Sequence, residues 1–174
     1  YVPSTLQWEQ RGVTIEQDGE FPQSSSTTFT VKTTQKQHFA LNLLIPSWAE
    51  KASISINGKK TSVKVTGKAR YHTISRKWKD SDKVQLHLQG GFKIHHLQGD
   101  CQTIAISYGP MLLAFIENDK IELQLTEHQL LNNLQATDAS KGIFTLNHNG
   151  KQYTLRPLFD VDDETYSVYV QLKP

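Results

Sequence analysis

The stretch SISINGKKTSVKV, residues 53–65, is the clearest guide to how this chain folds. Its first four residues alternate polar and apolar side chains, as a strand with one buried face requires. Asn57-Gly58 follows, and this pair is the strongest short hairpin signal because both residues tolerate a positive φ. Val63 and Val65 extend the alternation into a returning strand. We therefore expect an antiparallel hairpin at this position.

The same pattern recurs on both sides of this hairpin. Further strands are expected at residues 13–15, 28–32, 39–45, 71–75, 84–88, 92–97, 103–107, 111–116, 143–146, 152–155 and 165–172. The run 39–45 is more continuously apolar, which favours a central strand. Thr126 and Gln129 have capping-box spacing ahead of a leucine-rich face, which predicts one short helix near residues 126–134. The pattern predicts an all-β, jelly-roll-like antiparallel β-sandwich with one short helix.

The length of 174 residues suits one domain or two small sandwiches packed as a unit. We expect a single β-sandwich domain over residues 1–174. Its main sandwich would span about 1–117, and the helix and completing strands would follow at about 118–174. The chain opens at Tyr1 with neither a methionine nor a signal-like segment, which favours a processed chain or an excised fragment.

Charge and cysteine content exclude several classes of function. The chain carries 19 basic and 17 acidic residues, a net charge of +2, so it lacks the basic footprint that nucleic acid requires. No apolar run approaches membrane-spanning length. A single cysteine, Cys101, excludes an internal disulfide framework and a zinc site built from several cysteines.

The histidines do not have the spacing of a metal site. They lie at positions 38, 72, 87, 95, 96, 128 and 148. No pair has the helical i, i+4 spacing of a zinc protease, and His95 and His96 should point to opposite faces of a strand. His72 and His87 could meet across a hairpin, although each also fits an exposed strand position. We expect solvated or hydrogen-bonded imidazoles and no metal ligands.

Other candidate catalytic groups also have structural interpretations. The acidic residues Asp160, Asp162, Asp163 and Glu164 suit a polar turn better than a glycosidase pair or a calcium loop. Cys101 is expected to be a buried or semi-buried inert thiol. The chain has no nucleophile elbow, phosphate loop or dinucleotide fingerprint. We assign no catalytic, cofactor-binding or metal-ligating residue.

Aromatic side chains are the remaining candidates, because exposed rings can stack on the apolar faces of sugars. The chain offers Trp8, Trp48, Trp78, Tyr71, Tyr108, Tyr166 and Tyr169. Trp48 and Trp78 occupy strand ends in otherwise apolar surroundings. There a ring that packs in the core of the sandwich is the ordinary role.

An ordered series of motifs suggests a family. The motifs are LLIPSWA (43–49), ISING (54–58), YHTISRKWKDSDKV (71–84) and AISYGPMLLA (105–114). In this order they resemble the β-sandwich part of glycoside hydrolase family 127, the β-L-arabinofuranosidase-like proteins, and the resemblance spans nearly the whole chain. Two positions depart from the family pattern. Arginine is usual where Leu44 stands, and glycine where Ser81 stands. The first departure would remove a contact toward the family's catalytic barrel, and the second changes only a turn.

The resemblance implies that the chemistry resides outside this chain. Family members use a cysteine nucleophile in a zinc site built from Glu and several Cys, with a Glu acid/base, all on an (α/α) barrel. The expected partner of this chain is therefore the catalytic barrel of the same parent protein, and no cofactor is expected here. The resemblance also implies a bacterial parent that is secreted or periplasmic.

Three functions remain open at this point. The first is a non-catalytic accessory sandwich that supports the barrel of a glycosidase acting on L-arabinofuranosides or related plant glycans. The second is an autonomous carbohydrate-binding module, which predicts exposed aromatic rings gathered on one face. The third is a structural or adhesive domain without a ligand, which predicts a flat apolar patch and self-association.

Overall fold

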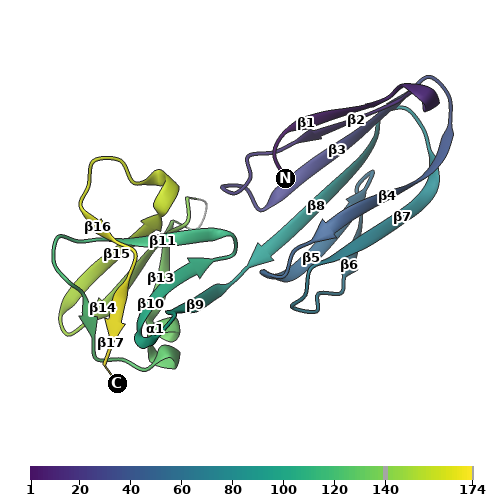
Figure 1. Ribbon diagram of the computed structural model, residues 1–174. Coiled ribbons are helices and arrows are strands. Elements are labelled where there is room, and N and C mark those ends of the chain that lie inside the picture. Colours follow the sequence, from purple (N-terminus) through teal and green to yellow (C-terminus); the bar gives the residue numbers. More distant parts are fainter. Residues whose placement is uncertain (139–140, 174) are drawn as a thin grey trace. The chain divides into compact units, whose positions relative to one another are not determined.

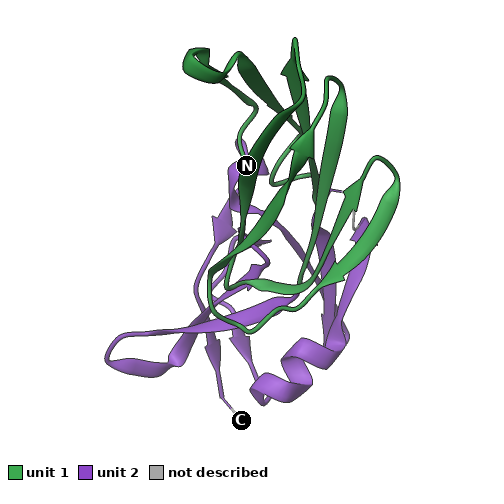
Figure 2. Cartoon of the chain, turned by 90° about the vertical axis from the view of Figure 1, so that its right-hand side faces the viewer, with its two compact units in different colours: residues 1–90 green, residues 91–174 purple. Residues whose placement is uncertain are grey.

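The computed structural model describes residues 1–138 and 141–173. The chain divides into two compact units, Tyr1–Gly90 and Gly91–Pro174, which are coloured separately in Figure 2. The division that the sequence suggested near residue 117 falls inside the second unit, directly after strand β11 (Met111–Ile116). Each unit has its own hydrophobic core.

Unit 1 is a sandwich of two antiparallel sheets (Figure 1). Its strands are β1 (Ser4–Trp8), β2 (Val13–Asp18), β3 (Ser26–Thr33), β4 (Gln37–Ile45), β5 (Ala49–Ile56), β6 (Lys59–Val63), β7 (Arg70–Trp78) and β8 (Asp82–Gly90), and the 3₁₀ helix η1 (Glu9–Arg11) follows β1. Six strands form one sheet in the order β1-β2-β3-β8-β5-β6, and β4 pairs with β7 in a second sheet.

Side-chain alternation explains how this sandwich closes. Along β8, Val84, Leu86 and Leu88 are buried, and the residues between them are exposed. From the two-stranded sheet, Trp78 contributes a fully buried ring that stacks on Phe39 at 5.5 Å between centroids. The indole Nε1 of Trp78 donates a hydrogen bond of 3.0 Å to the Phe39 carbonyl, which satisfies its polar atom inside the core. The predicted core role of Trp78 is confirmed.

The predicted Asn57-Gly58 hairpin is confirmed, and a second Asn-Gly pair turns another hairpin. Asn57 and Gly58 have φ values of 49° and 85°, and they join β5 to β6. Asn149 and Gly150 have φ values of 49° and 75° in the hairpin of β14 (Ile143–His148) and β15 (Lys151–Pro157). Two consecutive left-handed residues give the twist that a two-residue hairpin loop needs.

The prediction of a central strand at residues 39–45 is wrong. These residues belong to β4, which pairs only with β7 in the two-stranded sheet. Phe39, Leu43 and Ile45 face the core, whereas Leu44 lies on the outer face and is 38% exposed. The continuous apolar run therefore does not mean that both faces of this strand are buried.

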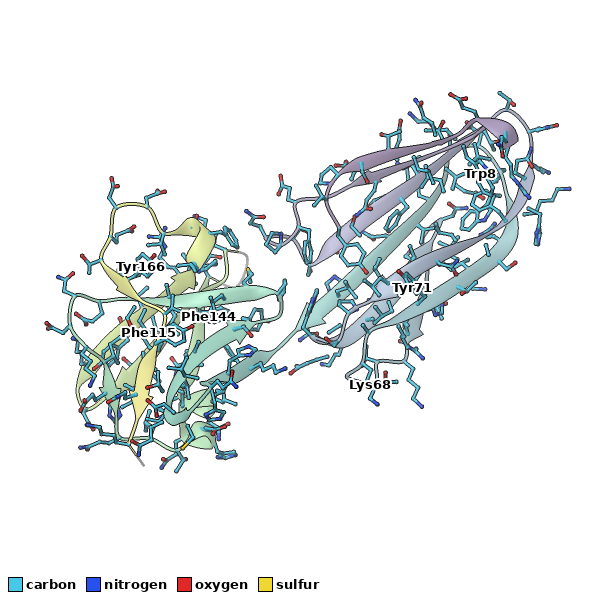
Figure 3. All side chains as sticks on the ribbon, viewed as in Figure 1. Trp8, Lys68, Tyr71, Phe115, Phe144 and Tyr166 are labelled. Atoms are coloured by element: carbon cyan, nitrogen blue, oxygen red, sulfur yellow. The ribbon has the colours of Figure 1, made fainter. Side chains whose placement is uncertain are left out.

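Unit 2 curls one large sheet around its own core (Figure 1). Its strands are β9 (Phe92–Leu97), β10 (Asp100–Tyr108), β11, β12 (Glu122–Leu123), β13 (Leu134–Asp138), β14, β15, β16 (Tyr166–Ser167) and β17 (Val170–Leu172), with the 3₁₀ helix η2 (Leu158–Asp160). The strands pair antiparallel, except that β12 runs parallel to β17. Phe115 and Phe144 belong to the core of this unit (Figure 3).

The only α-helix among the described residues lies where the capping box predicted it. Helix α1 spans Glu127–Asn133, and Thr126 is its N-cap. The Thr126 hydroxyl accepts from the backbone N–H of Gln129, and the Gln129 side chain accepts from the backbone N–H of Thr126. Leu130 anchors the helix in the core. The predicted all-β, antiparallel fold with one short helix is therefore confirmed.

Candidate functional site

A buried carboxylate holds two turns of unit 1 together. Asp82 begins β8, and its side chain is fully buried. It accepts hydrogen bonds from the side-chain amide of Asn57 at 2.8 Å and from the backbone N–H of Lys79 at 3.1 Å. The Arg76 guanidinium lies 3.7 Å from the same carboxylate and 5.1 Å from the centroid of the Trp78 ring. These contacts join the β5–β6 turn to the β7–β8 turn.

The surroundings keep Asp82 ionised. Burial by itself would raise the pKa of this carboxyl, because the charged form loses hydration. Hydrogen bonds from Asn57 and Lys79, together with the Arg76 charge, outweigh burial and hold the pKa of Asp82 below its ordinary value. Sequence reasoning did not single out Asp82 as a buried residue. The alternation of buried and exposed residues along β8 could have predicted this burial, since Asp82 lies on the same face of the strand as Val84 and Leu86.

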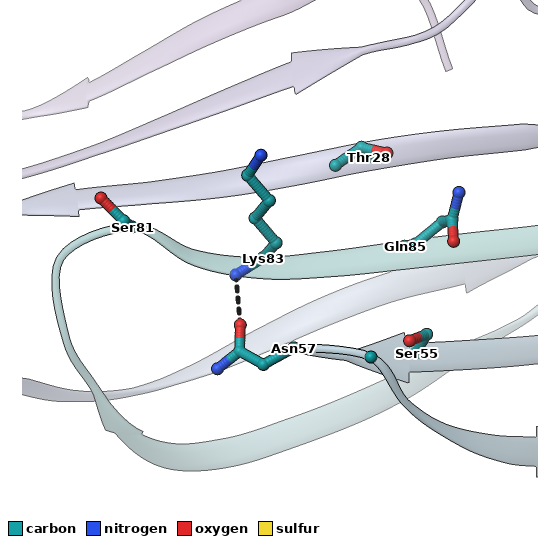
Figure 4. A pocket seen from close by; sticks show the side chains of 7 residues that line it. Thr28, Ser55, Asn57, Ser81, Lys83 and Gln85 are labelled. Atoms are coloured by element: carbon teal, nitrogen blue, oxygen red, sulfur yellow. Dashed lines mark hydrogen bonds between the residues drawn. The ribbon is translucent and has the colours of Figure 1, made fainter.

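A polar hollow lies beside this network on the six-stranded sheet (Figure 4). It has a volume of about 390 Å³ and is lined by Thr28, Ser55, Asn57, Gly58, Ser81, Lys83 and Gln85. The backbone N–H of Lys83 donates to the Asn57 side chain at 2.8 Å, shown as the dashed line in Figure 4. The lining residues include no carboxylate and no aromatic ring. The hollow can offer hydrogen bonds, but its lining holds no acid or base pair for catalysis.

Partly buried aromatic rings cluster elsewhere in unit 1. The Phe21 ring lies 5.5 Å from Tyr1 and stacks on Trp48 at 6.0 Å between centroids. Burial, with a contribution from the nearby Tyr71, raises the pKa of Tyr1 to about 12. Trp48 is partly buried, packs against the core and is stacked by Phe21, which leaves less of its ring open to a sugar. Tyr71 is 67% exposed and pairs across the strands with Leu44.

The suggested contact between His72 and His87 is wrong, whereas hydrogen-bonded imidazoles are present. His72 lies on β7 and His87 on β8, which belong to different sheets, so these two residues do not meet across a hairpin. The Nδ1 atom of His87 lies 3.0 Å from the Ser26 hydroxyl. His96 lies 3.1 Å from Glu127. Among the residues that the structure describes, no group of three or more His, Cys, Asp or Glu side chains could hold a metal ion.

The prediction of a buried or semi-buried Cys101 is wrong. The cysteine is exposed and is not part of a disulfide. It lies on β10 at a point where the pairing with β9 is interrupted between Asp100 and Ile104. The irregular pairing leaves the side chains of Cys101 and Gln102 exposed, and consecutive residues of β10 are buried only from Ile104 onward.

The acidic segment after β15 is organised by one arginine. Arg156 pairs with Glu164 and also donates to Asp160 at 3.0 Å. The backbone N–H groups of Glu164 and Asp162, together with Arg156, hold the pKa of Glu164 below its usual range. A lowered pKa is the opposite of the raised pKa that the general acid of a glycosidase needs. The preference for a polar turn agrees with this geometry.

A second hollow opens next to that segment. It has a volume of about 330 Å³ and is lined by Ile116, Glu117, Asn118, Glu164 and Thr165. Glu117 forms an ion pair with Lys151, which lowers the pKa of Glu117 from its ordinary value. Both carboxylates that line the hollow are therefore ionised and already paired with a cation.

Comparison with known proteins places unit 1 in a family. Residues 1–90 match the family described as "Beta-L-arabinofuranosidase, GH127 middle domain". These residues make up more than half of the chain and have the same bounds as unit 1.

The chain belongs to glycoside hydrolase family 127. The resemblance that the ordered motifs suggested is confirmed for the middle domain of this family.

Solved structures of glycoside hydrolases, two of them described as GH127 enzymes, share the fold. A protein described as a glycoside hydrolase aligns with 98% of this chain at 16% identity and a TM-score of 0.67. A GH127 β-L-arabinofuranosidase from Geobacillus stearothermophilus aligns with 99% at 18% identity and a TM-score of 0.64. A further GH127 β-arabinofuranosidase aligns with 98% at 18% identity and a TM-score of 0.65. The chain spans about a third of the length of each. The comparison with curated proteins found no match.

Within the described part of this GH127 chain, no helix has the length and apolar character needed to cross a membrane.

Proposed function

We propose that this chain is the non-catalytic accessory β-sandwich of a family 127 glycosidase that acts on L-arabinofuranosides or related plant glycans. The observation that carries the proposal is the match of residues 1–90 to the GH127 middle domain, with the same bounds as unit 1. Two structural relatives are described as arabinofuranosidases, which supports the substrate class.

The proposal assigns catalysis to an (α/α) barrel of the parent protein. A family site built from Glu and several Cys needs more cysteines than this chain possesses, because Cys101 is its only one. Cys101 lies on β10 in unit 2, outside the residues that match the middle domain. The zinc ion of the family would therefore be held by the barrel.

The role of unit 1 is to pack against that barrel and stabilise it. An exposed pair, Leu44 and Tyr71, lies on the outer face of the β4–β7 sheet and offers apolar surface for such packing. Leu44 stands where family members usually carry arginine, so this part of the contact would be apolar in the present protein.

The coding sequence that precedes Tyr1 tests the proposal directly. We expect an (α/α) barrel with a Glu and Cys cluster, and a different preceding domain would contradict the proposal. A second test mixes this chain with the barrel, expressed separately. Complex formation, followed by size-exclusion chromatography, should fall in Leu44→Asp. It should persist in the control Leu97→Asp, which changes a leucine of unit 2 with similar exposure.

A turnover assay tests the absence of a complete active site. The isolated chain should release no product from an aryl β-L-arabinofuranoside, whereas the barrel and chain together should release it. Turnover by the isolated chain, retained in Cys101→Ala, would contradict a purely accessory role.

A further inference from the structure

The hollow of unit 2 adjoins an exposed aromatic ring. Ile116 lines the hollow and lies directly opposite Tyr166 in the β11–β16 pair. Residues directly opposite each other in an antiparallel pair place their side chains on the same face, with Cβ atoms about 5 Å apart. The neighbouring pair, Phe115 and Ser167, puts Phe115 on the core face. The Tyr166 side chain, labelled in Figure 3, is 47% exposed and therefore lies outside the core, on the same face of the strand pair as Ile116 of the hollow.

Polar groups that suit hydroxyl groups line the hollow next to this ring. The carboxylates of Glu117 and Glu164 are held by Lys151 and Arg156, so their positions are fixed before any ligand arrives. Each carboxylate can accept more than one hydrogen bond and keeps acceptor capacity beyond its ion pair. The side-chain amide of Asn118 makes no hydrogen bond within residues 1–138 and 141–173 and can both donate and accept.

We propose that this hollow, together with the adjoining Tyr166, binds a neutral saccharide unit; its lining residues are Ile116, Glu117, Asn118, Glu164 and Thr165. One apolar face of the sugar ring stacks on Tyr166, and its hydroxyls donate to the two carboxylates and exchange hydrogen bonds with Asn118. The volume of about 330 Å³ is at the lower end of the range for small-molecule sites, which suits one or two sugar rings. This site is separate from the packing role of unit 1 and does not depend on it.

The charges of the hollow select the class of sugar. Two carboxylates line it, each paired with one cation, and the adjoining segment adds three more acidic residues, so that carboxylates outnumber the cations Lys151 and Arg156; the three are Asp160, Asp162 and Asp163. A uronic acid would add a further negative charge at close range, which like-charge repulsion opposes. The ligand is therefore a neutral saccharide, such as a pentose or hexose unit of a plant glycan, and not an acidic one.

Affinity electrophoresis of this chain tests the proposal. The gels contain soluble arabinan, galactan or arabinoxylan as neutral probes and polygalacturonate as the acidic probe. We expect retardation by at least one neutral glycan and none by polygalacturonate. Titration calorimetry with the retarding glycan should show binding that is weakened about tenfold in Tyr166→Ala, which loses the stacking ring. In Asn118→Ala the loss should be about threefold to tenfold.

Controls separate a ligand site from a folding defect. Tyr166→Phe keeps the ring and should bind within about twofold of the wild type, because stacking needs no hydroxyl. Tyr71→Ala removes an exposed tyrosine from unit 1 and should bind as the wild type does. No retardation by any neutral glycan would overturn the proposal. So would retardation by polygalacturonate alone, or unchanged binding in Tyr166→Ala. Each of these measurements leaves the barrel-packing assay unaffected.

Discussion

Replacement of Asp82 is the strongest test of how unit 1 is stabilised. In Asp82→Ala, the side-chain amide of Asn57 and the backbone N–H of Lys79 lose their acceptor. A hydrogen bond to a charged group contributes about 1.5 to 3 kcal/mol, and the lower figure applies to each of these two bonds because Asn57 and Lys79 are themselves exposed residues. Arg76 is 36% exposed, so water can solvate its charge and moderate the loss of the ion pair. We expect the free energy of unfolding to fall by about 3 kcal/mol.

Urea unfolding followed by tryptophan fluorescence measures this loss. All three tryptophans of the chain, at positions 8, 48 and 78, belong to unit 1, so their fluorescence reports on that unit. Asp80→Ala is the matched control, because Asp80 is an exposed neighbour that bonds Thr33 and Ser81. We expect a much smaller change in this control. A loss in Asp82→Ala below about 0.5 kcal/mol, or equal to that in the control, would refute the reasoning.

Acid should remove the contribution of Asp82. Its pKa is lower in the folded chain than in the unfolded chain, so the folded state favours the ionised carboxylate. The stabilisation is present above the unfolded pKa, about 4, and is lost as the pH falls through the folded value. The gap in stability between the wild type and Asp82→Asn, measured from pH 7 to pH 3, should shrink toward the acid end. A gap that widens in acid would contradict this assignment.

Four further substitutions test individual features by urea unfolding, followed by circular dichroism. Ser81→Gly should stabilise the chain by about 0.5 to 1 kcal/mol, because Ser81 has a φ of 63°; a destabilised variant would contradict this. Gly142→Ala should cost about 2 kcal/mol, since its φ is 69° and the added carbon would meet a methionine and a proline side chain at 3.0 and 3.1 Å. In Gly150→Ala the added carbon would meet no atom within 4 Å, so only the φ of 75° opposes it and the cost should be about 1 kcal/mol. Equal losses in Gly142→Ala and Gly150→Ala would disprove the role of crowding at Gly142. Trp78→Phe should cost about 2 to 4 kcal/mol through the cavity and the lost hydrogen bond to Phe39, and a change under 1 kcal/mol would count against that packing.

Much of the fold could be predicted because the relevant signals are local. The Asn57-Gly58 and Asn149-Gly150 turns depend on the φ values of two adjacent residues, and the α1 capping box depends on two residues three apart. The strands β9 and β11 have the predicted bounds, since alternation or a short apolar run between turn residues was enough to locate them. The short strand β1 was missed because its residues are mostly exposed and carry little pattern.

The candidate sites could be predicted much less well. The exposed position of Cys101 follows from an irregular pairing of β9 with β10, which no local pattern reveals. The place of Tyr166 beside a hollow depends on its register opposite Ile116, about fifty residues away along the chain. The sequence offered Tyr166 only as one of several aromatic candidates.

The sequence by itself determined the strands, the tight turns, the helix cap and the family resemblance, because each depends on neighbouring residues or on the order of motifs. Only the tertiary structure decided which sheet β4 joins, that Asp82 is buried and paired, and that Tyr166 lies opposite a residue of a polar hollow. The physical reason is that burial and charge pairing are properties of strand register and sheet packing, which bring together residues far apart in the chain. Residues 53–65 predicted a hairpin, and the packed unit made the Asn57 of that hairpin a hydrogen-bond donor to a buried carboxylate.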